Sequence, residues 1–192
     1  MRCTVSIRDM VIDYELVRRD VRNPRLEFLE GELYLIVPRS FREHEKIIRK
    51  HQRWIYNRYS RLQKIQDLSQ DIELVSHRSV DELKRIIQKY ASEIEKELNV
   101  RPEKIRFREM KTKWGSCSSR GNLNFNTFMR YLPDEMIEYI VHHEMVHLIE
   151  LNHSSRFWNY VKKRYPDYKE SETKLAAYWS LIQQKYHTGH SL

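Results

Sequence analysis

The sequence predicts a mixed α+β fold with one central, nearly all-apolar helix. Residues 2–38 carry β-type runs, whereas residues 41–66 and 80–98 repeat their apolar side chains at helical spacing. Two short β-type runs, 104–109 and 122–127, precede the apolar helix, so we expect a small sheet beside it.

The first elements are predicted to be a β-hairpin and a long basic helix. Residues 26–29 and 33–37 face each other across a turn at Gly31, which is a hairpin pattern. Ser40 followed by Glu43 predicts a capping box at the start of an amphipathic helix over 41–66.

A polar connector, 67–79, leads from that helix into the second half of the chain. Ser79 and Glu82 have the spacing of another capping box and should open the helix over 80–98. The other expected elements are a turn over 115–121 and two closing helices over 155–164 and 170–186.

Length, composition and cysteine content favour a single cytoplasmic domain. The chain has 192 residues, of which 40% are hydrophobic, and this suits one core. The start lacks the apolar stretch of a signal peptide, and no apolar run approaches a membrane span. Cys3 and Cys117 are too few for a disulfide framework or a cysteine-based zinc site. The expected organisation is one domain over 1–192, with a β-rich part (1–40), the basic helix (41–66) and a third part (80–187).

The apolar helix carries the sequence His143-Glu144-Met145-Val146-His147, an H-E-x-x-H motif. Positions 143 and 147 lie one helical turn apart, so both imidazoles can bind one ion, and Glu144 flanks it. Zinc binds neutral imidazole, and three protein ligands leave a fourth position for water. The ion makes that water acidic, and Glu144 can take its proton. The motif therefore predicts a hydrolytic zinc site.

A third histidine, His153, stands six residues after His147. Chance would give this triple in about 0.2% of shuffled chains. On a straight helix His153 would lie about 240° round from His147. The chain must therefore turn between residues 148 and 152, and Asn152 is best able to adopt a left-handed conformation there.

A ligand from a later helix is the competing pattern for the third position. The candidates at a suitable distance are Asp167, Glu170 and Glu172. We prefer His153, because its offset is a known ligand spacing and because carboxylates near a helix start complement the helix dipole. Cys117 is interpreted as a packed turn residue, since no cysteine-protease signature surrounds it.

Residues 111–158 resemble the YgjP-like family of predicted zinc metallopeptidases, which is itself similar to the SprT-like proteases. The matching pieces are Trp114-Gly115-Ser116-Cys117-Ser118, Gly121, Asn126, Pro133, the H-E-x-x-H motif, Asn152-His153 and Phe157-Trp158. The resemblance implies a zincin-like fold in which His143, His147 and His153 bind zinc and Glu144 is the catalytic base. On this basis 80–187 is the catalytic part.

We therefore expect a zinc metallopeptidase with one zinc ion per chain. The ion polarises the scissile carbonyl, while Glu144 deprotonates the water and passes the proton to the leaving amine.

The strand over 122–127 alternates apolar residues with asparagines. As an edge strand it could hold an extended peptide, although an ordinary half-exposed strand fits the pattern equally well.

The basic segment supplies a rival function. The net charge is +8, and 41–66 holds eight lysines and arginines against Glu43 and Glu45. Such a surface could bind nucleic acid, so a basic binding protein with a structural metal site is the alternative, as is a protease acting on DNA-associated proteins. We favour an ordinary solvated helix face. A closed site with four ligands would favour the alternative, and an open position would favour the enzyme.

Overall fold

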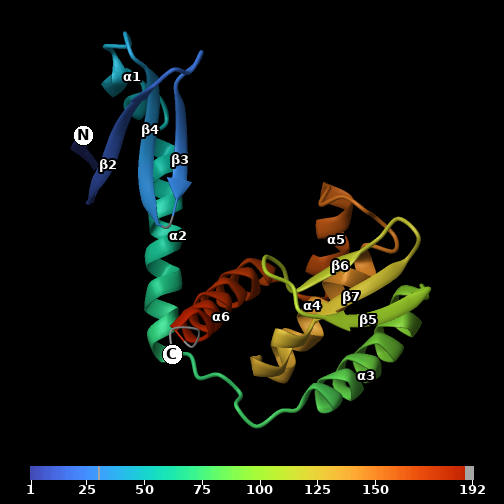
Figure 1. Ribbon diagram of the computed structural model, residues 1–192. Coiled ribbons are helices and arrows are strands. Elements are labelled where there is room, and N and C mark those ends of the chain that lie inside the picture. The colour runs from blue at the N-terminus through green and yellow to red at the C-terminus, as the bar shows by residue number, and fades with distance from the viewer. Residues whose placement is uncertain (30, 189–192) are drawn as a thin grey trace. The chain divides into compact units, whose positions relative to one another are not determined.

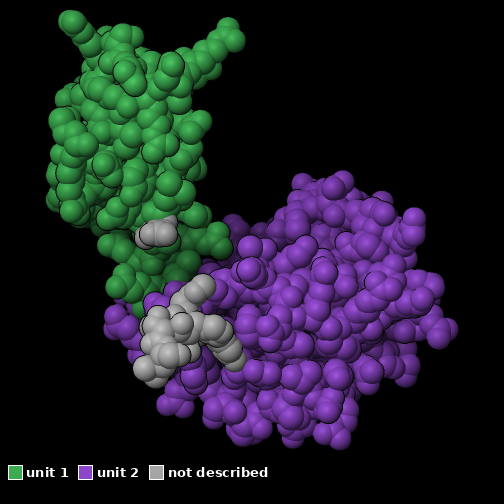
Figure 2. Space-filling view, in the orientation of Figure 1, with its two compact units in different colours: residues 1–66 green, residues 67–192 purple. Residues whose placement is uncertain are grey.

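The computed structural model describes residues 1–29 and 31–188, and the chain divides into two compact units (Figure 2). The first unit comprises residues 1–66 and the second residues 67–192. Each unit has its own cluster of buried hydrophobic side chains, which is the physical basis of the division. The division falls after residue 66, the predicted end of the basic helix, and the expectation of one domain over 1–192 stays a prediction.

A four-stranded sheet with the order β1-β2-β4-β3 forms the first unit (Figure 1). Its strands are β1 (Arg2–Ile7), β2 (Met10–Arg19), β3 (Arg25–Leu29) and β4 (Glu32–Pro38). The predicted hairpin is confirmed, because β3 and β4 pair antiparallel with Leu26 opposite Leu35. Gly31 has a φ of 88° in the turn, a conformation that glycine adopts without steric cost. The inner strands β2 and β4 are parallel.

The basic segment forms two helices, α1 (His44–Lys50) and α2 (Gln52–Asp71), instead of one. The predicted capping box is wrong, because Glu43 is the N-cap of α1 and makes no side-chain capping hydrogen bond. Arg18 explains the late start: its guanidinium donates to the carbonyls of Arg39 and Phe41 at 3.2 and 2.6 Å. These contacts hold the chain outside a helix up to residue 41. The helices separate at His51, and α2 ends five residues beyond the predicted end at 66.

In the second unit, α3 (Val80–Leu98) confirms the predicted second helix. The capping box is present: Glu82 N–H donates to Ser79 Oγ at 3.1 Å, and Ser79 N–H donates to a Glu82 carboxylate oxygen at 2.7 Å. Asn99 ends the helix with a left-handed φ of 51°.

A three-stranded sheet with the order β5-β7-β6 lies beside the helices (Figure 1). Its strands are β5 (Lys104–Arg108), β6 (Gly115–Cys117) and β7 (Asn122–Asn126). The strand predicted over 122–127 is the central one, with β5 parallel on one side and β6 antiparallel on the other. The idea that it forms an edge open to a peptide is therefore wrong. Residues 115–117 were expected to be turn, but they form an edge strand.

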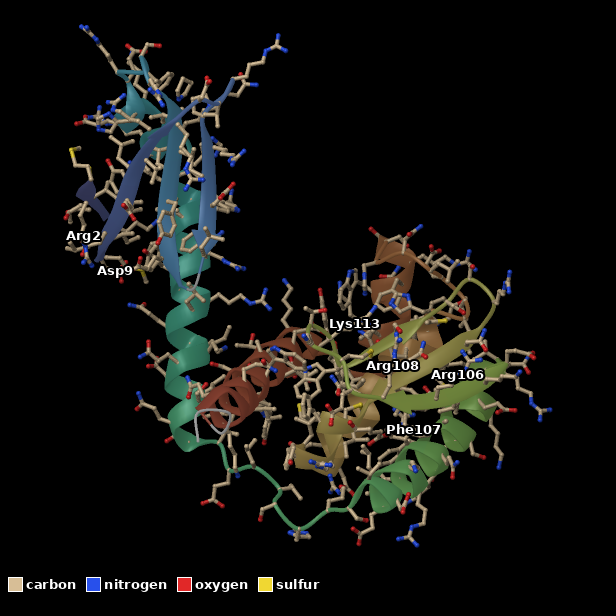
Figure 3. The ribbon with its side chains drawn as sticks, in the orientation of Figure 1. Arg2, Asp9, Arg106, Phe107, Arg108 and Lys113 are labelled. Atoms are coloured by element: carbon tan, nitrogen blue, oxygen red, sulfur yellow. The ribbon has the colours of Figure 1, made fainter. Side chains whose placement is uncertain are left out.

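The side chains of the edge strand β5 alternate between the hydrophobic core and solvent. Phe107 packs on the hydrophobic core, while its neighbours Arg106 and Arg108 are exposed (Figure 3). This alternation is the period-two pattern of a half-buried strand, and exposed cations discourage pairing with another chain at this edge.

Three helices and a 3₁₀ turn complete the second unit. Their bounds are η1 (Thr127–Tyr131), α4 (Asp134–Val146), α5 (Ser155–Arg164) and α6 (Tyr168–Thr188). The predicted central helix is α4, which has Pro133 at its N-cap and nine buried residues. None of the described helices is long and apolar enough to cross a membrane.

Candidate metal centre

The three sequence-predicted histidines come together at the end of α4. His143 lies in the last turn of the helix, His147 is its C-cap residue, and His153 lies in the loop before α5. One ring nitrogen from each lies within 4.8 Å of the others, and these three are the group of possible metal donors among the described residues. Nε2 of His143 faces Nε2 of His153 at 3.0 Å.

The turn that returns His153 to the site starts directly after α4. The N–H groups of Leu148, Ile149 and Glu150 donate to carbonyls of the last helical turn at 3.0, 2.9 and 3.0 Å. The predicted left-handed conformation of Asn152 is wrong, because Arg8 and Asn99 are the non-glycine residues with positive φ in the described chain. Hydrogen bonds close to the helix end make the turn instead.

A side-chain hydrogen bond within the same turn fixes the tautomer of His147. Its Nδ1 lies 3.0 Å from the carbonyl oxygen of Glu150. A carbonyl can only accept, so Nδ1 carries the proton and donates. The lone pair of His147 is then on Nε2, which leaves that nitrogen free to bind a metal.

Aromatic side chains of α5 support the histidines. Phe157 is fully buried, and its ring centroid lies 4.5 to 4.9 Å from those of all three imidazoles. Trp158 stacks on His153 with the planes 27° apart. Ser154 starts the helix by accepting a hydrogen bond from Phe157 N–H at 3.4 Å, which fixes where these rings stand.

Glu144 is buried beside the histidines, with a side chain against the edge strand β6. The residue is 6% exposed, and its Oε2 has no hydrogen-bond partner. A Cβ placed on Gly115 would come within 2.6 Å of Glu144 Cγ and 2.7 Å of Oε1. Only a glycine allows this approach, since real Cβ contacts are not that short.

The loop before β6 is held by Asn126. This fully buried side chain donates from Nδ2 to the carbonyls of Met110 and Lys113 at 2.8 and 2.9 Å. Its backbone N–H donates to Trp114 O at 2.8 Å. Asn126 thereby positions Gly115 and also Lys113, which lies in this loop (Figure 3).

Burial controls the charge of the site. It lowers the pKa of His143 to about 3, and the neighbouring His147 and His153 add to this effect. It also raises the pKa of Glu144 to about 8, with an opposing effect from Lys113. Neutral imidazoles are the ligating form, and a buried carboxylate favours a nearby cation. The donor set and the unpartnered carboxylate oxygen therefore fit a divalent metal ion.

The other predicted candidates are not members of this donor group. Burial raises the pKa of Cys117 to about 11, with a further contribution from Glu144, so the thiol stays protonated and packs on the core. Glu170 and Asp167 are exposed near the start of α6. Glu172 approaches His143 from the Nδ1 side, at 3.9 Å, and not from the side that faces His153.

Sequence reasoning missed the supporting roles of Gly115, Asn126, Tyr139 and Phe157. Gly115 and Asn126 were recognised only as parts of a motif. A glycine at this position of the motif was the available signal, because glycine often marks the close approach of another group. Tyr139 precedes His143 by four residues, so helical periodicity puts both on one face.

The arrangement defines a metal-dependent hydrolase, and comparisons with known proteins identify its family. The sequence model of the YgjP-like metallopeptidase domain matches residues 66–178, which is more than half of the chain. The chain belongs to the YgjP-like family of metallopeptidases. A search of curated proteins found no match.

Two solved structures are similar over about half of the chain. Abylysin of Pyrococcus abyssi, a metallopeptidase zymogen, is 25% identical and has a TM-score of 0.41, over 45% of this chain and 87% of that one. Jannalysin of Methanocaldococcus jannaschii, also a metallopeptidase zymogen, is 26% identical with a TM-score of 0.41, over 51% of this chain and 95% of that one.

The contact between Gly115 and Glu144 can be tested by stability. We expect Gly115→Ala to lower the free energy of unfolding by about 1–3 kcal/mol, because the new methyl group overlaps the carboxylate side chain. In a Glu144→Ala background the same change should cost almost nothing. Urea unfolding of the four proteins measures this coupling. An equal cost in both backgrounds would show that Glu144 does not limit residue 115.

Proposed function

We propose that this metallopeptidase uses one zinc ion, bound by His143, His147 and His153, to hydrolyse peptide bonds. The observation that carries this proposal is the convergence of three histidine nitrogens within 4.8 Å, beside the buried carboxylate of Glu144. Zinc is favoured over harder ions, because all three donors are imidazole nitrogens.

Glu144 is proposed as the general base. A bound zinc ion would supply a Lewis acid and make a water in the site more acidic. Glu144 Oε2, which is buried and has no hydrogen-bond partner, would take a proton from water and later deliver it to the leaving amine. Gly115 allows the carboxylate to stand against β6, next to the histidines.

The edge strand β6 is proposed to bind the substrate backbone. Within the described part of the chain β6 pairs with β7 alone, so its other edge can accept an extended peptide through main-chain hydrogen bonds. Because Gly115 of β6 touches Glu144, a peptide on this edge would bring a scissile bond close to the base. Such binding would not depend on the substrate's side chains.

A purely structural metal site is less well supported. Structural zinc sites have four protein ligands, whereas the donor group among the described residues contains three. His153 is also exposed, unlike the buried His147, so one side of the group faces solvent. These features suit an ion with an open position.

The role of Glu144 is tested by Glu144→Gln. We expect this variant to keep about one zinc ion per chain and to lose activity on the order of a hundredfold or more, because the amide cannot accept the proton. Hydrolysis of an unfolded protein, measured beside metal content, checks both points. Glu135→Gln is the matched control, since Glu135 is exposed in the first turn of the same helix. Loss of zinc from Glu144→Gln would instead make Glu144 structural.

The third ligand is tested by His153→Ala. We expect it to weaken zinc binding far more than Glu170→Ala, because Glu170 lies exposed at the start of α6. Chelator competition on folded protein measures the affinities. His77→Ala, which removes an exposed histidine from the connector before α3, controls for nonspecific effects. Tight zinc binding by His153→Ala would contradict the assignment.

One observation favours a second candidate function, the binding of single-stranded nucleic acid by the first unit. Trp54 on α2 is 46% exposed and its ring lies 5.5 Å from that of Phe28. At 100° per residue, the exposed cations of α2 lie within about 140° of the helix circumference, on the same side as Trp54. They are Arg53, Arg58, Arg61 and Lys64.

Charge and stacking would act together on this surface. No ion pair involves these four cations among the described residues, whereas Arg49 of α1 pairs with Glu45 at 3.6 Å. Unpaired cations attract phosphates, and an exposed indole offers a face on which a base can stack. A single strand supplies both groups.

Salt dependence tests this second function. We expect binding of single-stranded DNA to weaken as salt rises, and reversing Arg53, Arg58 and Arg61 to glutamate should reduce the slope by about 0.7 for each lost phosphate contact. Trp54→Ala should lower affinity about tenfold with little change in slope. Arg106→Glu, on an exposed strand of the other unit, is the control. No binding at low salt would exclude the function.

A further inference from the structure

One ring nitrogen of the proposed metal site has no partner of its own. Nδ1 of His143 is buried and makes no hydrogen bond, while Nε2 of the same ring faces His153. A neutral imidazole carries one proton. If Nε2 binds the ion, Nδ1 must carry that proton, and a buried N–H group requires an acceptor.

A carboxylate of α6 approaches this nitrogen. Oε1 of Glu172 lies 3.9 Å from His143 Nδ1. This distance is longer than a hydrogen bond, and a shift of about 1 Å would bring the two atoms within hydrogen-bond distance. The carboxylate is about one-third exposed, so its side chain has room to move.

Tyr139 holds this carboxylate beside the histidine. Its hydroxyl donates to Glu172 Oε1 at 2.6 Å, and the tyrosine itself is 1% exposed. Burial, followed by the charge of Glu172, raises the pKa of Tyr139, so the hydroxyl remains protonated as a donor. Tyr139 and His143 are four residues apart on α4 and therefore share one face.

We propose that Glu172, held by Tyr139, is a positioning residue whose carboxylate accepts a hydrogen bond from His143 Nδ1–H when the metal site is loaded. This inference rests on the proposed function, because it requires Nε2 of His143 to be the ligating atom. It gives each histidine of the H-E-x-x-H motif its own acceptor: the Glu150 carbonyl for His147 and the Glu172 carboxylate for His143. Such partners fix ring orientation and make the imidazole a stronger ligand.

Glu172 is less suited to bind the ion itself. Its Oε1 lies on the Nδ1 side of His143, whereas Nε2 of the same ring faces Nε2 of His153 at 3.0 Å. The donor group found among the described residues contains histidines alone. The Glu172 carboxylate therefore contacts the proposed ligand His143 on the Nδ1 side of its ring and does not bind the ion.

Zinc affinity tests the proposal without depending on catalysis. We expect Glu172→Ala to weaken zinc binding by about 10-fold to 100-fold in chelator competition, and Glu172→Gln to recover part of the loss, because its amide oxygen can still accept. Tyr139→Phe should have a smaller effect, which is largely absent in the Glu172→Ala background. Glu170→Ala is the matched control, since it removes an exposed carboxylate two residues earlier.

A spectroscopic readout separates positioning from general destabilisation. In zinc-loaded protein, ¹H–¹⁵N spectra should contain a hydrogen-bonded Nδ1–H signal from His143, and Glu172→Ala should remove it while the His147 signal persists. The proposal would be overturned if Glu172→Ala changed neither the zinc affinity nor the Nδ1–H signal of His143. A loss of affinity as large as that of His153→Ala would also overturn it, by making Glu172 a ligand. Failure of the wild-type protein to bind zinc would instead reject the proposed function.

Discussion

The burial of Glu144 is the constraint on which the second unit depends. Burying a carboxylate in an apolar core costs free energy unless hydrogen bonds or a cation compensate it. Glu144 is one of the nine buried residues of α4. A helix so apolar must be central, so α3, α5 and β6 all contact it. β6 can approach the carboxylate only through Gly115, and Asn126 holds the loop that delivers that glycine. The precision of the site follows from the packing of its core.

The three histidines are fixed by means that differ in their range along the chain. His147 is oriented by a carbonyl three residues away, and His153 is stacked on Trp158 five residues away. The acceptor proposed for His143 is 29 residues distant, on α6. Local contacts can therefore orient His147 and His153 as soon as the turn after α4 forms. The orientation of His143 depends on the complete fold, because α6 must pack against α4 before Glu172 can approach His143.

This difference in range also explains what the sequence could predict. Ser79 and Glu82 form a capping box within one turn, and the hairpin of β3 and β4 is equally local, so both were predictable. The start of α1 was not, because Arg18 sets it from a distant strand. In the site, the motif and His153 were visible as spacings, whereas the contact of Gly115 with Glu144 and the partner of Tyr139 depend on tertiary packing.

The boundary between the units separates two kinds of surface chemistry. The YgjP-like match begins at residue 66, where the first unit ends, and the three grouped histidines lie in the second unit. Residues 1–66 hold 15 lysines and arginines against nine aspartates and glutamates, an excess of six in a total net charge of +8. Most of the net positive charge therefore lies in the first unit. Because each unit packs its own hydrophobic cluster, substitutions on the exposed face of α2 change charge without disturbing the packing that holds His143.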